Sequence, residues 1–201
     1  MSAAVAIAMS EVGMLAVGLR LALDAARRAG CRIRPWVWTS AVVTASVLAS
    51  TVACAGSVSS LRVLPALAAA GVSTITDMQT GYVFDRVLLP AASAVCVLAL
   101  ALGAMEAVTA GAILTGSILW ALHAWTKGRG LGFGDVKLAA LLGGAVGARG
   151  VAELLTIAFV TAAAVAVMLL LCGQRRRKDS MAFAPFLSAA ACVVVVLQAQ
   201  R

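Results

Sequence analysis

Two aspartates beside apolar segments are the residues of this chain best placed to do chemistry. Asp135 ends a glycine-rich run that begins at Gly130 and leads into an apolar segment, and Asp77 directly follows an earlier apolar segment. Two carboxyl groups held close together cannot both ionise cheaply, so one of them keeps a proton. The ionised acid can then activate a water molecule while the protonated acid polarises a carbonyl group. This arrangement predicts hydrolysis that requires neither a metal nor a cofactor.

The two acids differ in their expected positions on helices. Asp135 can cap the N-terminus of the segment that follows it, where the helix dipole favours negative charge. Asp77 closes a helix, and a carboxylate there is disfavoured by about 0.3–1 kcal/mol. We therefore expect Asp135 to be the more readily ionised acid and Asp77 to hold the proton. Gly132 and Gly134 lack side chains, so a substrate backbone could approach this loop closely.

The composition places the chain among membrane proteins. Hydrophobic residues make up 63% of the 201 positions and charged residues only 12%, and the mean hydropathy is +1.03. The net charge of +8 comes from basic residues between apolar runs, which predicts membrane topology rather than nucleic-acid binding. The five cysteines are scattered singly and predict neither a zinc site nor a disulfide framework.

The apolar runs predict an all-α integral membrane protein with about eight transmembrane helices. A domain of two helices and a short basic cytoplasmic loop is expected at 1–60, and a six-helix core at 61–201. The runs at 61–76 and 136–149 are shorter than the roughly 20 residues needed to cross a bilayer, and they adjoin the two acids. The predicted spans are 3–23, 36–56, 61–76, 86–105, 107–125, 136–149, 151–172 and 182–199.

The basic residues predict the orientation of these spans. If the arginines between the first two spans are cytoplasmic, every Lys and Arg except Arg62, Arg149 and Arg201 faces the cytoplasm. Both termini then lie outside. Two spans separate Asp77 from Asp135, so both acids and their loops are expected at the cytoplasmic face.

Other residues receive more ordinary interpretations. His123, near the inner end of a predicted span, is expected to be a satisfied packing residue. Small residues recur every four positions at Ala139, Gly143 and Gly147, which predicts close helix packing. Glu11 lies inside the first predicted span, where headgroup contact or a functional role is open.

Three blocks of the sequence resemble type IV prepilin peptidases, which are membrane aspartic proteases. Residues 132–138, Gly-Phe-Gly-Asp-Val-Lys-Leu, resemble the GxGD-x-KL signature of that family. Residues 77–85 are similar to its first catalytic block, in which an Asp precedes Ile-Pro-Asn or Ile-Pro-Asp. Residues 183–187, Phe-Ala-Pro-Phe-Leu, resemble its Pro-Phe-Gly-Pro-Phe-Leu element.

The resemblance implies the activity of the chain and the roles of several residues. It implies an aspartic endopeptidase of the bacterial plasma (inner) membrane, multi-pass, that cleaves prepilin-like precursors before their hydrophobic helix at the cytoplasmic surface. Asp77 and Asp135 match the catalytic positions. Accessory or substrate-binding positions fall on Gly132, Phe133, Gly134, Lys137 and Asp85. The implied partners are a prepilin-like membrane protein and the lipid bilayer, with no cofactor, metal or nucleic acid.

The chain departs from the family pattern at two positions and in one loop. Phe84 stands where Pro is usual, and Ala184 where Gly is usual. The bifunctional members of the family carry paired CxxC motifs and also N-methylate the mature pilin. The loop at 24–35 contains only Cys31, so we expect a short form with peptidase but no methyltransferase activity, as in members serving tight-adherence (Tad/Flp), competence or related secretion systems.

Two other functions fit the same acids. A non-catalytic transporter or pilus or secretion assembly subunit could use Asp77 and Asp135 for proton relay or substrate pairing. A transporter would place such acids nearer the bilayer midplane, whereas these lie at the ends of spans, which favours the protease. A degenerate relative that binds prepilin without cutting it is the second alternative, and Phe84 keeps it open.

Overall fold

The computed structural model describes residues 62–128, 130–172 and 182–199, and this part of the chain is helical without strands. The predicted all-α class is therefore confirmed for these residues. The predicted domain at 1–60 lies outside them. The helices are α3 (Leu64–Thr80), α4 (Asp85–Ala101), α5 (Met105–Trp125), α6 (Phe133–Val146), the short 3-10 helix η2 (Ala148–Gly150), α7 (Val151–Leu171) and α8 (Ala184–Ala199).

The two helices that carry the acids have well-defined ends. α3 ends at Thr80 and is capped by Gly81, whose φ of 67° is a left-handed conformation. The Gly81 N–H donates to the Asp77 carbonyl at 2.9 Å. The helix runs through Asp77 to Thr80, further than the predicted span. α6 begins at Phe133 with Gly132 at its N-cap. Asp77 therefore lies in the last turn of α3, and Asp135 in the first turn of α6.

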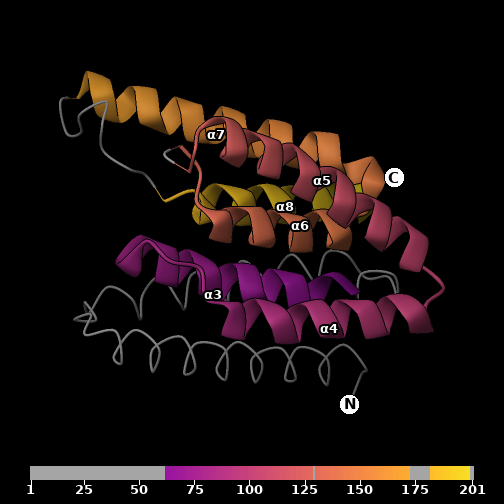
Figure 1. Ribbon diagram of the computed structural model, residues 1–201. Helices are drawn as coiled ribbons and strands as arrows, with labels where there is room; N and C mark the ends of the chain where they lie inside the picture. Colours follow the sequence, from indigo (N-terminus) through magenta and orange to yellow (C-terminus); the bar gives the residue numbers. More distant parts are fainter. Residues whose placement is uncertain (1–61, 129, 173–181, 200–201) are drawn as a thin grey trace, which may run out of the picture.

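The helices form three tiers, with α6 in the middle one. In Figure 1, α3 and α4 lie below, α6 and α8 between, and α5 and α7 above. α6 contacts α3, α4, α5, α7 and α8. Most of its residues are buried, including Leu138 and Leu142, which are fully enclosed. A central helix with so little exposed surface fixes the position of its first turn and thereby of Asp135.

Glycines let α5 and α6 approach closely. A Cβ atom on Gly143 of α6 would overlap the Thr115 side chain and the Gly111 carbonyl of α5. A Cβ on Gly111 would in turn overlap the Gly143 backbone. The close packing predicted from the small residues of α6 is thus confirmed at Gly143. This contact holds α6 against the helix that precedes the glycine-rich loop.

In the described part of the chain, two helices are long and apolar enough to cross a bilayer, Met105–Trp125 and Ala148–Met168. The six spans predicted after residue 60 each correspond to an α-helix, although α3, α4, α6 and α8 have 14–17 residues. The expectations of eight spans, outward termini and cytoplasmic loops stay predictions.

Candidate active site

Asp77 is a buried acid that is hydrogen-bonded to the start of α8, a helix far from it in the sequence. Its side chain is only 8% exposed. Its Oδ2 accepts a hydrogen bond from the backbone N–H of Ala184 at 3.2 Å. Ala184 is the first residue of α8, so the positive end of that helix dipole faces the carboxylate. The position at the end of α3 is unfavourable for negative charge, and α8 offsets it.

Asp135 is equally buried but less completely hydrogen-bonded. Its side chain is also 8% exposed, and among the residues that the structure describes nothing donates to its Oδ1. A backbone hydrogen bond from Gly132, the N-cap residue, stabilises its charged form. Asp135 therefore reaches back to the helix start from within the first turn, and the expectation that it is itself the cap is wrong. A buried carboxyl oxygen without a donor is available to a water or a substrate.

The two carboxyl groups influence each other's ionisation. Both lie outside the two helices that are long enough to cross a bilayer. Burial raises the pKa of Asp135 to about 7, and the nearby negative charge of Asp77 contributes to that rise. Burial also raises the pKa of Asp77, while backbone hydrogen bonds at Ala184 and Phe183 oppose the rise. The Ala184 N–H stabilises charge on Asp77, whereas the Asp135 Oδ1 has no donor among the described residues. These hydrogen bonds favour the opposite assignment to the one expected from helix ends.

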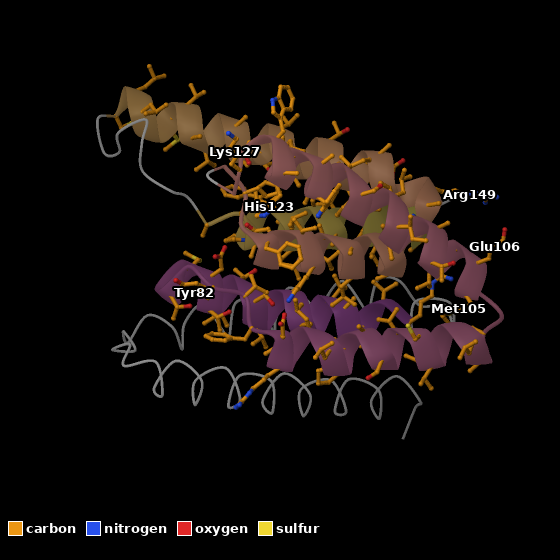
Figure 2. All side chains as sticks on the ribbon, in the orientation of Figure 1. Tyr82, Met105, Glu106, His123, Lys127 and Arg149 are labelled. Carbon is orange, nitrogen blue, oxygen red and sulfur yellow. The ribbon has the colours of Figure 1, made fainter. Side chains whose placement is uncertain are left out.

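The loops that carry the acids lie at the same end of the bundle. Figure 2 shows Tyr82, after α3, at the end where His123 and Lys127 lie, opposite Glu106 and Arg149. This agrees with the prediction that the acids share a face, although the side of the membrane is untested. Because both loops lie at this end, Asp77 and Asp135 could act on the same substrate.

Gly134 brings these two loops into contact. A Cβ atom on Gly134 would lie 2.9 Å from the Val83 Cβ, which is closer than real Cβ contacts. The missing side chain therefore allows Val83 of the α3–α4 loop to pack on the first turn of α6. Gly132 is exposed, and a Cβ there would make only an ordinary contact, 3.4 Å from the Asp135 Oδ2. Of the two glycines expected to admit a substrate backbone, Gly132 is therefore the more accessible.

Lys137 and Asp85 form an ion pair beside the acids. The Lys137 Nζ lies 2.7 Å and 2.8 Å from the two carboxylate oxygens of Asp85. The same ammonium group lies 5.1 Å from the ring centroid of Phe133. The side chains of Lys137 and Asp85 are 40% and 56% exposed, so this pair adds little stability. It joins the start of α4 to the start of α6.

His123 holds the glycine-rich loop in place. Its Nδ1 is hydrogen-bonded to the Leu131 carbonyl at 2.7 Å, and its ring packs on Phe133 at a centroid distance of 5.7 Å. His123 is thus hydrogen-bonded, as expected for a packing residue. Its partners Leu131 and Phe133, however, belong to the short stretch just before the catalytic candidate Asp135. The signal available in the sequence was a histidine at a helix end followed by a run of glycines.

The described residues hold no group of three or more His, Cys, Asp or Glu side chains that could bind a metal ion. Two acids with different pKa values in a partly desolvated position can act as general acid and general base.

Comparison with known proteins identifies the family. A profile of the type IV leader peptidase family matches residues 63–167, slightly more than half of the 201 residues. The chain therefore belongs to the type IV leader peptidase family, which is membrane-associated. Both Asp77 and Asp135 lie inside the matched range. Residues 183–187 lie outside it.

Two curated relatives are similar to part of the chain. Each is a prepilin leader peptidase/N-methyltransferase of Burkholderia pseudomallei, from strains 1026b and K96243, and each is 34% identical over 119 residues. The alignment covers 56% of this chain and 38% of each relative, so the chain spans about two-fifths of their length. No solved structure matches the chain significantly. The predicted lack of methyltransferase activity depends on residues 24–35, outside the described residues, and stays a prediction.

Proposed function

We propose that this chain is a membrane aspartic endopeptidase that removes the leader peptide of type IV prepilin-like precursors. Its catalytic residues are Asp77 and Asp135, its core is 61–201, and it acts at the cytoplasmic face of the bacterial inner membrane. The observation that carries the proposal is the pair of buried, electrostatically coupled carboxyl groups at one end of the bundle. Family membership supports leader-peptide cleavage as the reaction.

The environments of the two acids support different roles. Asp77 accepts the Ala184 N–H and is the ionised member, so it removes a proton from a water molecule as the water oxygen attacks the scissile carbonyl carbon. Asp135 holds its proton and donates a hydrogen bond to the carbonyl oxygen, where negative charge develops. These steps produce a tetrahedral intermediate at the substrate carbon.

The intermediate collapses when the proton on Asp77 passes to the leaving nitrogen and the carbon–nitrogen bond breaks. Asp135 keeps its proton throughout, and its hydrogen bond to the oxygen weakens as the carbonyl group re-forms. The products are a carboxylic acid on the leader and an amine on the mature protein. One water is consumed, both acids return to their starting protonation states, and no cofactor takes part.

Processing by isosteric variants tests the proposal. The chain is expressed with a candidate prepilin, and Asp77→Asn and Asp135→Asn are compared with the unmodified chain by the size of the pilin product. Each variant is expected to lose at least about 1,000-fold in rate because the two acids act as a unit. The matched control is Glu106→Gln, an exposed carboxylate at the opposite end of the bundle, which should process normally.

Membrane levels of each variant are measured in parallel, so that loss of protein is not mistaken for loss of chemistry. Unchanged processing by either Asn variant would exclude the acid pair. If the unmodified chain also leaves every prepilin uncut, a non-catalytic assembly role replaces the protease.

A further inference from the structure

An apolar groove lies between α4, α5 and α6. Its volume is about 370 Å³. Leu88, Leu89 and Cys96 line it from α4, Ala112 from α5, and Ala140 and Gly144 from α6. Leu89 is 68% exposed. Apolar surface this accessible beside a partly enclosed groove suits an apolar occupant.

One end of the groove is charged and adjoins the candidate active site. Asp85 and Lys137, which pair at 2.7 Å, are the acidic and basic side chains among the described residues that line it. Lys137 follows Asp135 by two residues on α6, an axial rise of about 3 Å. The groove is therefore apolar along its length and polar at one end, its mouth, where Asp85 and Lys137 lie. The mouth lies within one helical turn of Asp135.

The shape and lining of the groove favour a helix as the occupant. From Asp85 to Cys96 it follows α4 for about three turns, or roughly 16 Å. Alanines and a glycine on the facing helices allow another helix backbone to approach closely, as small residues do between membrane helices. Gly144 itself has no room for a side chain, because a Cβ would lie 3.1 Å from the Val108 carbonyl oxygen.

The charged residues at the mouth favour binding of the polar end of such a helix. Half-exposed Asp85 and Lys137 offer an acceptor and a cation to polar residues of an occupant. A lipid tail is apolar along its whole length and matches only the apolar part of the groove. A helix that is apolar along its length and polar at its N-terminal boundary satisfies both parts of the groove.

We propose that this groove binds the apolar helix of the substrate, with the N-terminal end of that helix at the Asp85–Lys137 pair. This inference rests on the proposed function, in which the cleaved bond precedes a hydrophobic helix. The leader then passes over the mouth of the groove toward Asp135. The groove fixes the distance from the apolar helix to the acids, and so selects the bond that is cut.

A native cysteine allows a direct test. Every cysteine except Cys96 is replaced by alanine, and Asp135→Asn is added to keep the substrate uncut. Single cysteines are introduced along the first four turns of the substrate helix, and disulfide formation is induced in membranes. Cys96 is expected to crosslink to positions spaced three or four residues apart, which mark one helix face.

The control chain keeps only Cys172, an exposed cysteine at the end of α7 that does not line the groove. It is expected to form at most one-tenth of the Cys96 product. Equal crosslinking of both cysteines, or none at Cys96, would overturn the proposal. A lipid in the groove would leave Cys96 uncrosslinked to substrate. Occupation by residues 1–61 would instead crosslink Cys96 to Cys31 or Cys54 of the unmodified chain.

Kinetics supply a second readout in the active protein. Ala92 lines the groove, and Ala92→Phe should raise KM for the full-length substrate about tenfold with kcat within twofold. Val97→Phe, at an exposed position of α4 outside the lining, should change neither. Normal KM in Ala92→Phe together with no Cys96 crosslink rejects the groove while leaving the peptidase intact. Absence of cleavage by the unmodified chain rejects the proposed function instead.

Discussion

The two ends of this helical bundle differ in how far the carboxyl groups at each end are exposed to solvent. At the end marked by Tyr82 and His123 in Figure 2, Asp77 and Asp135 are each only 8% exposed. At the opposite end, the exposed Glu106 and Arg149 line an open pocket of about 670 Å³.

Removing a carboxyl group from water costs free energy, so the buried Asp77 and Asp135 carry a cost that the exposed Glu106 does not. Burial of this kind, combined with perturbed pKa values, is characteristic of functional sites. The comparison therefore supports the proposal that Asp77 and Asp135 carry the chemistry. It also predicts that substitutions at the two ends have different consequences for stability and for activity.

The largest difference is expected in stability, from Asp135→Asn against Glu106→Gln. Burial, together with the nearby charge of Asp77, raises the folded-state pKa of Asp135 to about 7 from an ordinary value of 3.8. Its stabilising protonated form is therefore fully present below about pH 4 and is lost as the pH rises through about 7. Above that pH, Asp135→Asn should stabilise the fold by an amount on the order of a few kcal/mol.

Thermal unfolding in detergent at pH 4 and pH 8 measures this gain. The melting temperature of Asp135→Asn should exceed that of the unmodified chain at pH 8 and match it at pH 4. Glu106→Gln should match the unmodified chain at both. A destabilised Asp135→Asn at pH 8 would show that the carboxylate is satisfied in the fold, and would remove the contrast between the ends.

The second difference concerns the contact between the two loops. Gly134→Ala places a Cβ about 2.9 Å from the Val83 Cβ, and overpacking of this kind costs about 1–3 kcal/mol. Processing should fall together with melting temperature, because Asp135 is the next residue. The additional change Val83→Gly removes the opposing Cβ and should recover part of the loss in a double-mutant cycle.

Gly132→Ala is the matched control for that substitution. Its new Cβ would lie 3.4 Å from the Asp135 Oδ2, an ordinary contact, so the loss of stability should be smaller. Equal losses in the two alanine variants would mean that general loop flexibility, and not contact with Val83, explains the effect.

The smallest of these effects is expected at His123. His123→Phe keeps a ring beside Phe133 and removes the hydrogen bond to the Leu131 carbonyl, which is worth about 1 kcal/mol. Amide exchange in the loop at 126–132 should become faster and processing should fall by up to about tenfold. Trp125→Phe, at an exposed neighbouring position, is the control. Unchanged exchange in His123→Phe would mean that the loop does not depend on this hydrogen bond.

Much of this arrangement could be predicted from local patterns. Apolar runs gave the helices of the described part, and the count of spans between Asp77 and Asp135 placed both acids at the same end. Small residues indicated close packing in which Gly143 takes part. Each of these inferences depends on periodicity or on composition within one segment.

The errors arose where a distant segment supplies the deciding contact. Asp77 was expected to hold the proton because it ends α3, yet the start of α8 donates to it from Ala184. Gly134 was expected to face a substrate, yet it faces Val83. His123 was expected to be a satisfied packing residue, which its hydrogen bond confirms, but the sequence did not indicate Leu131 as the partner. None of these contacts can be derived from the spacing of residues within one helix.

The pH dependence of kcat/KM tests the central claim most directly, because it reports the protonation states of the free enzyme. The proposed mechanism requires an ionised Asp77 and a protonated Asp135 in the free enzyme. The rate should rise on the acid side as Asp77 ionises and fall near pH 7 as Asp135 loses its proton, with both limbs belonging to the coupled pair. A rate that is flat from acid to alkaline pH, or that stays high from pH 7 to about pH 9, would contradict a shared proton between these two acids.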